Sequence, residues 1–222
     1  LTFFYFGLDR AICHCAGQDL KSLEALTAEW ASRSPTSPTA HLAHAMVLSK
    51  RAWAIRGNGF ASTVRPENWA PFHEFIEAGR AYLMEHKAVA ARDPHWYVTM
   101  IEVARDQGWK KDRLLGLVDE AMALDPGYYQ TYFSAAFALQ PKWGGSMAEI
   151  DAFARDIARR TVEHEGDSLY ARIYWSVASE LGGNLFQTSR ADWPLMKKGF
   201  DDIVSRYPDA WNLNNYAKFA CM

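Results

Sequence analysis

Apolar residues recur along the chain with the spacing of amphipathic helices, and runs of strict apolar–polar alternation are missing. Ten such segments are separated by clusters of Pro, Gly, Asn and Ser. The pattern therefore predicts an all-α fold. The expected helices cover approximately residues 20–32, 39–56, 66–91, 94–106, 112–124 and 126–139, followed by four that begin near Ser146, Ser168, Pro194 and Pro208.

Local signals refine some of these helices. Thr39 is expected to cap the second helix, and Ser146 with Glu149 forms a capping-box pattern. The first clear helical segment begins at Leu20, and a loop is expected to reach Asp192. The stripe predicted for the first helix consists of Leu20, Leu23, Leu26 and Trp30, and the stripe predicted for the last consists of Trp211, Tyr216 and Phe219.

The predicted helices come in consecutive pairs that resemble one another. Asp93-Pro94-His95-Trp96-Tyr97 recurs 32 residues later as Asp125-Pro126-Gly127-Tyr128-Tyr129. A fixed period of this length is typical of stacked helical repeats. We expect one domain over residues 1–222, with degenerate repeats at about 20–92, 93–124, 125–166, 167–207 and 208–222, the last one truncated.

One of these junctions resembles a known repeat family. The segment Ala121–Tyr129, with its central Asp-Pro, resembles the junction between tetratricopeptide repeats. The resemblance implies stacked antiparallel helical hairpins in a right-handed superhelix, with a concave wall on which a partner can bind.

A narrower resemblance covers most of residues 30–222. The segments that carry it are Trp53–Gly57, Pro141–Ser146, Tyr170–Trp175 and Arg206–Pro208, with Asn214 and Phe219–Cys221. They are similar to a bacterial domain-of-unknown-function family with a helical-repeat fold. That family implies a fold and no reaction, and residues 1–20 lie outside the match.

Composition and charge restrict the class of protein. In 222 residues, 49% are hydrophobic and 23% charged, as in ordinary globular proteins. A net charge of −2 indicates neither a nucleic acid nor an anionic membrane surface as partner. No apolar run approaches the ~20 residues of a membrane span, so a soluble protein is expected.

Three cysteines form no even disulfide framework, which favours a reducing compartment and a cytoplasmic protein. At the ends, Leu1–Phe6 lacks an initiating Met and a basic leader, and Asn212–Met222 lacks a helix-stop signal. Both ends predict a piece of a longer chain.

Three clusters contain possible metal ligands, but none has the spacing of a metal site. Cys13-His14-Cys15 lacks a second ligand pair, so buried small side chains are expected there. The pair His41 and His44 is expected on a solvated helix face. The cluster His73-Glu74-Phe75-Ile76-Glu77 is also expected to be solvated, because Glu77 stands where a zinc protease needs histidine. We therefore expect no metal.

Nucleophile and phosphate-binding motifs are also missing. The chain has no Gly-x-Ser-x-Gly elbow, and the glycines of Arg56–Phe60 follow a predicted helix and serve to end it. We expect no cofactor and no catalytic residue.

Arginine and tryptophan side chains supply the candidate binding residues. Arginines bind carboxylates through paired hydrogen bonds, and indole faces hold apolar or cationic groups. The candidate groove residues are Trp53, Arg56, Tyr129, Trp143, Arg172, Trp175 and Asn214.

These residues favour a non-catalytic module that binds a protein or peptide segment. A small-molecule binder or a hydrolase-type enzyme with a pocket between helices remains an alternative. Its mark would be an enclosed pocket in which a perturbed carboxylate or histidine lies beside an arginine. A structural domain of a larger bacterial assembly is a second alternative.

Overall fold

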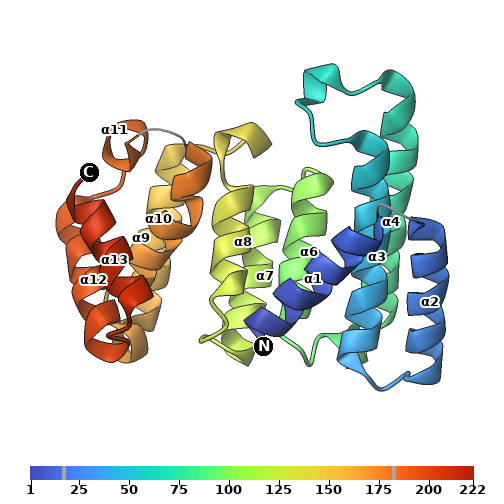
Figure 1. Cartoon of the computed structure of the whole chain (residues 1–222), viewed down its shortest axis with the longest axis horizontal. Coiled ribbons are helices and arrows are strands. Elements are labelled where there is room, and N and C mark those ends of the chain that lie inside the picture. Colours follow the sequence, from blue (N-terminus) through green and yellow to red (C-terminus); the bar gives the residue numbers. More distant parts are fainter. Residues whose placement is uncertain (17–18, 182–183) are drawn as a thin grey trace. The chain divides into compact units, whose positions relative to one another are not determined.

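The computed structural model describes residues 1–16, 19–181 and 184–222, while the side chains of residues 13–16 lie outside the described part. No β-strand occurs in these residues, so the predicted all-α class is confirmed. The helices (Figure 1) are α1 (Thr2–Ala16), α2 (Leu20–Arg33), α3 (Pro38–Arg56), α4 (Trp69–Glu85), α5 (Lys87–Ala90), α6 (His95–Asp106), α7 (Lys111–Leu124), α8 (Gln130–Ala138), α9 (Met147–Glu165), α10 (Ser168–Leu181), α11 (Leu185–Thr188), α12 (Trp193–Arg206) and α13 (Ala210–Ala220).

The helices form two compact units, one of residues Leu1–Thr131 and the other of residues Tyr132–Met222. In the first unit, α3 packs against α2 on one side and α4 on the other, and α6 contacts both α3 and α4. Residues 40–48 of α3 are all buried, so α3 is the central helix of this core.

The start of α3 differs from the prediction. Ser37 is the N-cap, and its hydroxyl accepts a hydrogen bond from the amide of Ala40 at 3.3 Å. Pro38 occupies the first helical turn, where its fixed φ angle suits the helix and its missing N–H costs nothing. The assignment of the cap to Thr39 was therefore wrong, because Thr39 already lies inside the helix.

The buried face of α2 also differs from the prediction. Thr27 and Ala31 are the buried residues of α2, while Leu26 is 61% exposed and Trp30 is 39% exposed. Small side chains allow α2 to lie close to α3, where Thr27 Oγ1 is 3.1 Å from His44 Nδ1. The predicted stripe was wrong at Leu26 and Trp30, because α2 packs through Thr27 and Ala31, while Leu20 and Leu23 are half-buried.

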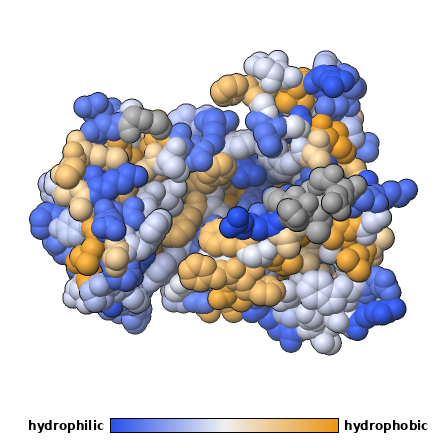
Figure 2. Space-filling view, viewed as in Figure 1, coloured by the Kyte–Doolittle hydropathy of each residue, from blue (hydrophilic) through white to orange (hydrophobic). Residues whose placement is uncertain are grey.

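Helix α1 was not predicted. Its residues are apolar on several faces, so no single stripe marks it, and only Tyr5 and Ile12 among its large described side chains are buried. It runs obliquely across α3 (Figure 1) and packs on α2 and α3. Figure 2 shows hydrophobic surface over this helix, to which the exposed Phe3, Phe4 and Phe6 belong.

The second unit is built on α9, α10, α12 and α13, which pack in this order. Ser146 is the N-cap of α9, at the helix start that the capping-box pattern predicted, and its Oγ accepts from the Glu149 amide at 3.2 Å. Helices α10 and α12 approach so closely that a Cβ at Gly199 would lie 2.5 Å from the carbonyl oxygen of Asp167.

The second unit differs from the predictions at two places. Helix α11 interrupts the loop that was expected to reach Asp192. On α13, Phe219 is buried as predicted, but Trp211 is 71% exposed.

Candidate functional site

A cavity of about 610 Å³ lies within the first unit. It is lined mainly by α1, α3 and α6, with Tyr128 and Gln130 from the chain around the start of α8. A volume of this size lies within the range of ~300–1,000 Å³ typical of small-molecule sites.

Helical periodicity explains why polar residues face the cavity. On α6, the lining residues His95, Thr99, Glu102 and Asp106 follow one another at spacings of three or four, so they share one face. Lys50 and Trp53 of α3 face the cavity for the same reason. The cavity is thus formed by three helix faces that carry charged and aromatic side chains.

Asp106 is fully engaged within the protein. Its Oδ2 accepts a hydrogen bond from Trp53 Nε1 at 2.8 Å, and its Oδ1 accepts from Arg105 Nε at 2.8 Å. Burial raises the pKa of Asp106 above its ordinary value, although the positive charge of Arg105 and the hydrogen bond from Trp53 oppose that change.

Lys50 and Asp9 form a second ion pair at the cavity, with Lys50 Nζ 2.9 Å from Asp9 Oδ1.

Glu102 differs from these charged groups, because its carboxyl makes no hydrogen bond or ion pair with any residue the structure describes. Burial is the largest influence on Glu102 and raises its pKa. The cavity therefore contains one carboxyl group that has no hydrogen-bond or ion-pair partner among the described residues.

His95 and two tyrosines form the other end of the cavity. The Tyr5 ring stacks on the His95 ring with a centroid distance of 3.8 Å, and His95 Nδ1 lies 2.8 Å from the Tyr128 hydroxyl. The Tyr5 hydroxyl donates to Asp93 Oδ2 at 2.6 Å. Burial lowers the pKa of His95 to about 3, so this imidazole is neutral at physiological pH.

The histidines of α3 are not solvated as predicted, because α3 is the core helix of the unit. His41 is 3% exposed and His44 is 8% exposed. The His41 ring stacks on His86 at 4.3 Å, and His41 Nδ1 lies 2.9 Å from the Tyr82 hydroxyl. Burial, with the nearby His41 and His86, lowers the pKa of His44.

The other two clusters of possible metal ligands lie on α4 and α1. His73, Glu74 and Glu77 are exposed, as predicted. The Cys13-His14-Cys15 prediction concerns side chains outside the described residues. Within the described part of the chain, no group of three or more His, Cys, Asp or Glu residues could hold a metal ion.

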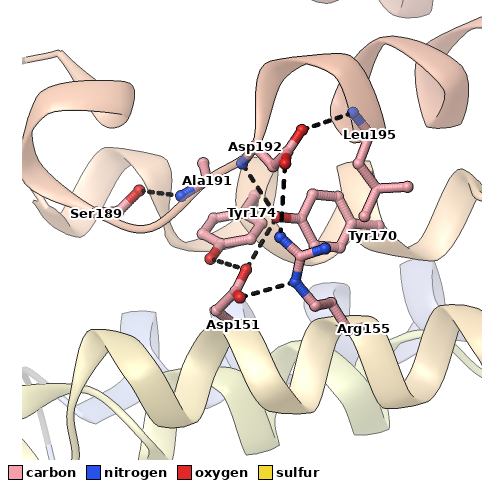
Figure 3. A network of polar contacts seen from close by, with 8 residues as sticks. All are labelled: Asp151, Arg155, Tyr170, Tyr174, Ser189, Ala191, Asp192 and Leu195. Atoms are coloured by element: carbon pink, nitrogen blue, oxygen red, sulfur yellow. Dashed lines mark hydrogen bonds and ion pairs between the residues drawn. The ribbon is translucent and has the colours of Figure 1, made fainter.

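A network of polar contacts in the second unit joins α9 to α10 and to the turn before α12 (Figure 3). The hydroxyls of Tyr170 and Tyr174 both donate to Asp151 Oδ1 at 2.9 Å. Arg155 Nε donates to Asp151 Oδ2 at 2.8 Å, and another of its nitrogens lies 3.7 Å from Asp192 Oδ2. The network is completed by the Asp192 amide, which donates to the Tyr170 hydroxyl at 3.0 Å.

These contacts determine the ionisation of Asp151. Burial alone would raise its pKa, but hydrogen bonds from Arg155, Tyr174 and Tyr170 outweigh burial and lower it. Burial also raises the pKa of Tyr170 to about 12, so that its hydroxyl stays protonated and donates.

The candidate groove residues of the first unit are Trp53, Arg56 and Tyr129. Trp53 lines the cavity. Arg56 lies over the Trp53 ring, with Cζ 4.8 Å from its centroid, and donates to the carbonyl oxygens of Gly57 and Gly59. Tyr129 is half-buried in the turn before α8.

In the second unit, α10 brings Arg172 and Trp175 close together. Arg172 Cζ is 5.7 Å from the Tyr207 ring centroid, and Trp175 stacks on Trp211 at 6.2 Å. Asn214 is exposed on α13. Trp143 is half-buried, with its ring 6.1 Å from that of Phe137.

The sequence pattern did not predict the charged residues of the cavity, which are Asp9, Lys50, Glu102, Arg105 and Asp106. The signal available on α6 was the spacing of His95, Glu102 and Asp106, which places polar groups on one face of a helix whose residues 95–101 are all buried. A polar stripe on an otherwise buried helix indicates a cavity or a polar network in the core.

No known protein-family model, curated protein or solved structure matches this chain. Among the described helices, none combines the length and apolar character required to cross a bilayer.

Proposed function

We propose that this protein is a non-catalytic helical-repeat protein that binds a small molecule in the cavity of its first unit. The observation that carries the proposal is the Glu102 carboxyl, which forms no ion pair with any described residue, in a cavity whose other charged groups have partners. The Glu102 carboxyl lies at the cavity, so a ligand with N–H donors gains charge-assisted hydrogen bonds there without displacing a described residue. This assignment favours the pocket alternative of the sequence analysis over the peptide-binding groove.

We further propose that the hairpins are tetratricopeptide-like repeats. Tyr128 and Tyr170 lie 42 residues apart, and each is followed four residues later by another tyrosine. Both are buried, and both place their hydroxyls on polar partners. Tyr132 and Tyr174, the next aligned pair, are buried as well. Equivalent buried positions in successive hairpins are typical of repeats that diverged from one unit.

Thermal unfolding of the full chain, measured with and without a panel of small molecules, tests the binding proposal. The panel should include amines, carboxylates, sugars and nucleosides. A ligand that binds only the folded state raises the unfolding midpoint, and above its Kd the stabilisation grows with the logarithm of the ligand concentration.

A pair of variants locates the binding site. Ala54 is exposed and lies at the cavity, so Ala54→Trp places an indole at its edge and should abolish the rise in midpoint. Ala78→Trp, at an exposed position of α4 away from the cavity, is the matched control and should preserve it. If no compound produces a rise that Ala54→Trp removes, the binding proposal is wrong.

A second candidate function is peptide binding by the second unit. The observation that favours it is the exposure of Trp211 and Tyr207, 71% and 47%, beside Arg172 and Trp175. Such a surface suits a peptide that has an aromatic or aliphatic anchor and a terminal carboxylate.

The peptide function is tested with one peptide library in two forms, with a free C-terminal carboxylate and with a C-terminal amide. The carboxylate form should bind more tightly, and Arg172→Ala should remove the difference. Equal binding of the two forms by the unmodified protein would contradict this candidate.

A further inference from the structure

The charged groups of the cavity indicate which class of ligand it holds. The cationic groups, Lys50 and Arg105, already lie on carboxylates, at 2.9 Å from Asp9 and 2.7 Å from Asp106. His95 is neutral, since burial lowers its pKa to about 3. An anionic ligand would therefore have to displace a carboxylate that belongs to the protein.

Glu102 is the charged group of the cavity that forms no hydrogen bond or ion pair with another described residue. It lies one helical turn before Arg105, but the Arg105 guanidinium is directed to Asp106. With both pairs formed, an ionised Glu102 gives the cavity a net charge of −1 from these five side chains, three acidic and two basic. A ligand that completes the cavity therefore has one positive charge and N–H donors.

The aromatic side chains that line the cavity favour an organic cation over a metal ion. Aromatic rings of Tyr5, Phe6 and Trp53 line the same cavity and supply apolar contact for a carbon skeleton. A metal ion is a poorer fit, because the described residues around Glu102 supply no set of three metal-binding side chains.

We propose that the cavity binds a small organic ammonium or guanidinium ion, with Glu102 as its counter-charge. This inference rests on the proposed small-molecule function and names its ligand class. The ammonium or guanidinium group donates hydrogen bonds to the Glu102 carboxylate, and the apolar part of the ligand lies against the aromatic rings.

Binding of this kind is coupled to the protonation of Glu102. The groups that act on its carboxyl are Arg105 and Asp106 of α6, Lys50 of α3 and Asp9 of α1. Burial outweighs them and raises the pKa of Glu102, so the empty cavity retains the proton to a higher pH than an exposed glutamate would. The cation binds the ionised form, and its affinity therefore rises as pH increases through this pKa.

Three probes of similar size and different charge test the inference. They are benzylamine, a cation, benzyl alcohol, which is neutral, and benzoate, an anion. Titration calorimetry with the full chain at neutral pH should give benzylamine an affinity at least about tenfold higher than that of benzyl alcohol, as expected for a charge-assisted contact in a partly desolvated site. Benzoate should bind more weakly than either.

Glu102→Gln should reduce the preference for benzylamine to less than about twofold while benzyl alcohol binds as before, since the amide keeps the size and loses the charge. Glu74→Gln, on an exposed face of α4, is the matched control and should leave all three affinities unchanged. Circular dichroism of each variant establishes that it is folded.

The failures of the two proposals are distinguishable. If benzyl alcohol or benzoate binds as tightly as benzylamine, or if the preference survives in Glu102→Gln, the cation inference is overturned. It is also overturned if the broader panel yields only neutral or anionic ligands that Ala54→Trp excludes, a result that would support the small-molecule function itself. If Ala54→Trp excludes no compound, the underlying function fails.

Discussion

The cavity of the first unit and the Asp151 network of the second unit are built from the same residue types, carboxylates beside arginine and aromatic rings. In the network, Tyr170, Tyr174 and Arg155 supply donors to both oxygens of Asp151. In the cavity, Arg105 and Trp53 do the same for Asp106, but no described residue does so for Glu102.

The pKa directions of the two carboxyl groups follow from this difference. Burial acts on both, but hydrogen bonds reverse its effect at Asp151 and not at Glu102. A completed network joins helices, whereas an incomplete one is available to a ligand. Residue type alone therefore does not distinguish a structural cluster from a binding site. The distinction lies in how many carboxylate oxygens accept hydrogen bonds from the protein.

The largest effect is expected from Asp151→Ala. The hydroxyls of Tyr170 and Tyr174, both of them on fully buried side chains, would lose their acceptor, and Arg155 would lose a charged partner. A buried donor without an acceptor costs ~1–3 kcal/mol, so we expect a loss of about 3 kcal/mol in the free energy of unfolding. Urea denaturation followed by circular dichroism measures it.

The control for this substitution is on the same helix. The ion pairs of Asp156 on α9 with described residues are surface pairs with Arg159 and Arg160, and such pairs contribute ~0–1 kcal/mol. Asp156→Ala should therefore change stability by less than about 1 kcal/mol. Similar losses for the two variants would show that the Asp151 network does not hold the second unit together.

A second effect concerns the response of the first unit to acid. Burial lowers the pKa of His95 to about 3, whereas an unfolded chain has a histidine pKa of about 6.5. Between these values the unfolded chain binds a proton that the folded chain excludes, so stability falls as pH decreases. From pH 7 to pH 5, His95 should account for a loss of about 2 kcal/mol.

Denaturant unfolding at the two pH values, with His95→Gln, isolates this contribution. The variant should lose about 2 kcal/mol less than the unmodified chain on acidification, whatever its stability at pH 7. His73→Gln, at an exposed position of α4, serves as control and should keep the original pH dependence. An unchanged pH dependence in His95→Gln would contradict the assignment of a neutral, buried imidazole.

Tyr174→Phe tests a single contact of the Asp151 network. The ring remains in place and one hydrogen bond to Asp151 is lost, while the bonds from Tyr170 and Arg155 persist. We expect a loss of about 1 kcal/mol, the usual net contribution of one hydrogen bond. Ser176→Ala, which removes a hydroxyl bonded to the Ile173 carbonyl on the same helix, is a suitable comparison and should cost less.

The sequence predicted the helices with clear stripes and failed where burial depends on contacts between distant residues. The stripes of α9 and α12 were predicted because their inward residues are large and apolar, as with Ile150, Phe153, Met196 and Phe200. The face of α2 was mispredicted because it packs through Thr27 and Ala31. Helix α1 was missed because its apolar residues form no single stripe, and several of them, including three phenylalanines, are exposed.

The candidate site shows the same limit. Trp53 was selected for its indole, and it does line the cavity. Glu102 was not selected, because its isolation depends on two pairings, Lys50 with Asp9 and Arg105 with Asp106. The first of these joins residues 41 positions apart on different helices, a contact that periodicity along one helix does not reveal.

The smallest effect in this comparison has the opposite sign, and it comes from Glu102→Gln. Because burial raises the pKa of Glu102 in the folded protein, ionisation at neutral pH opposes folding, and the amide removes this penalty. We therefore expect Glu102→Gln to be slightly more stable than the unmodified chain at pH 7, in the absence of any ligand. This gain in stability should shrink as pH falls toward the ordinary glutamate pKa of about 4.3, because Glu102 is then increasingly protonated in both the folded and the unfolded chain.

Asp151→Asn should instead lower stability at pH 7, since hydrogen bonds lower the pKa of Asp151 and its ionised form stabilises the fold. Urea unfolding of the two amide variants over this pH range measures both signs, and a loss of stability in both would place Glu102 in a completed structural network like that of Asp151.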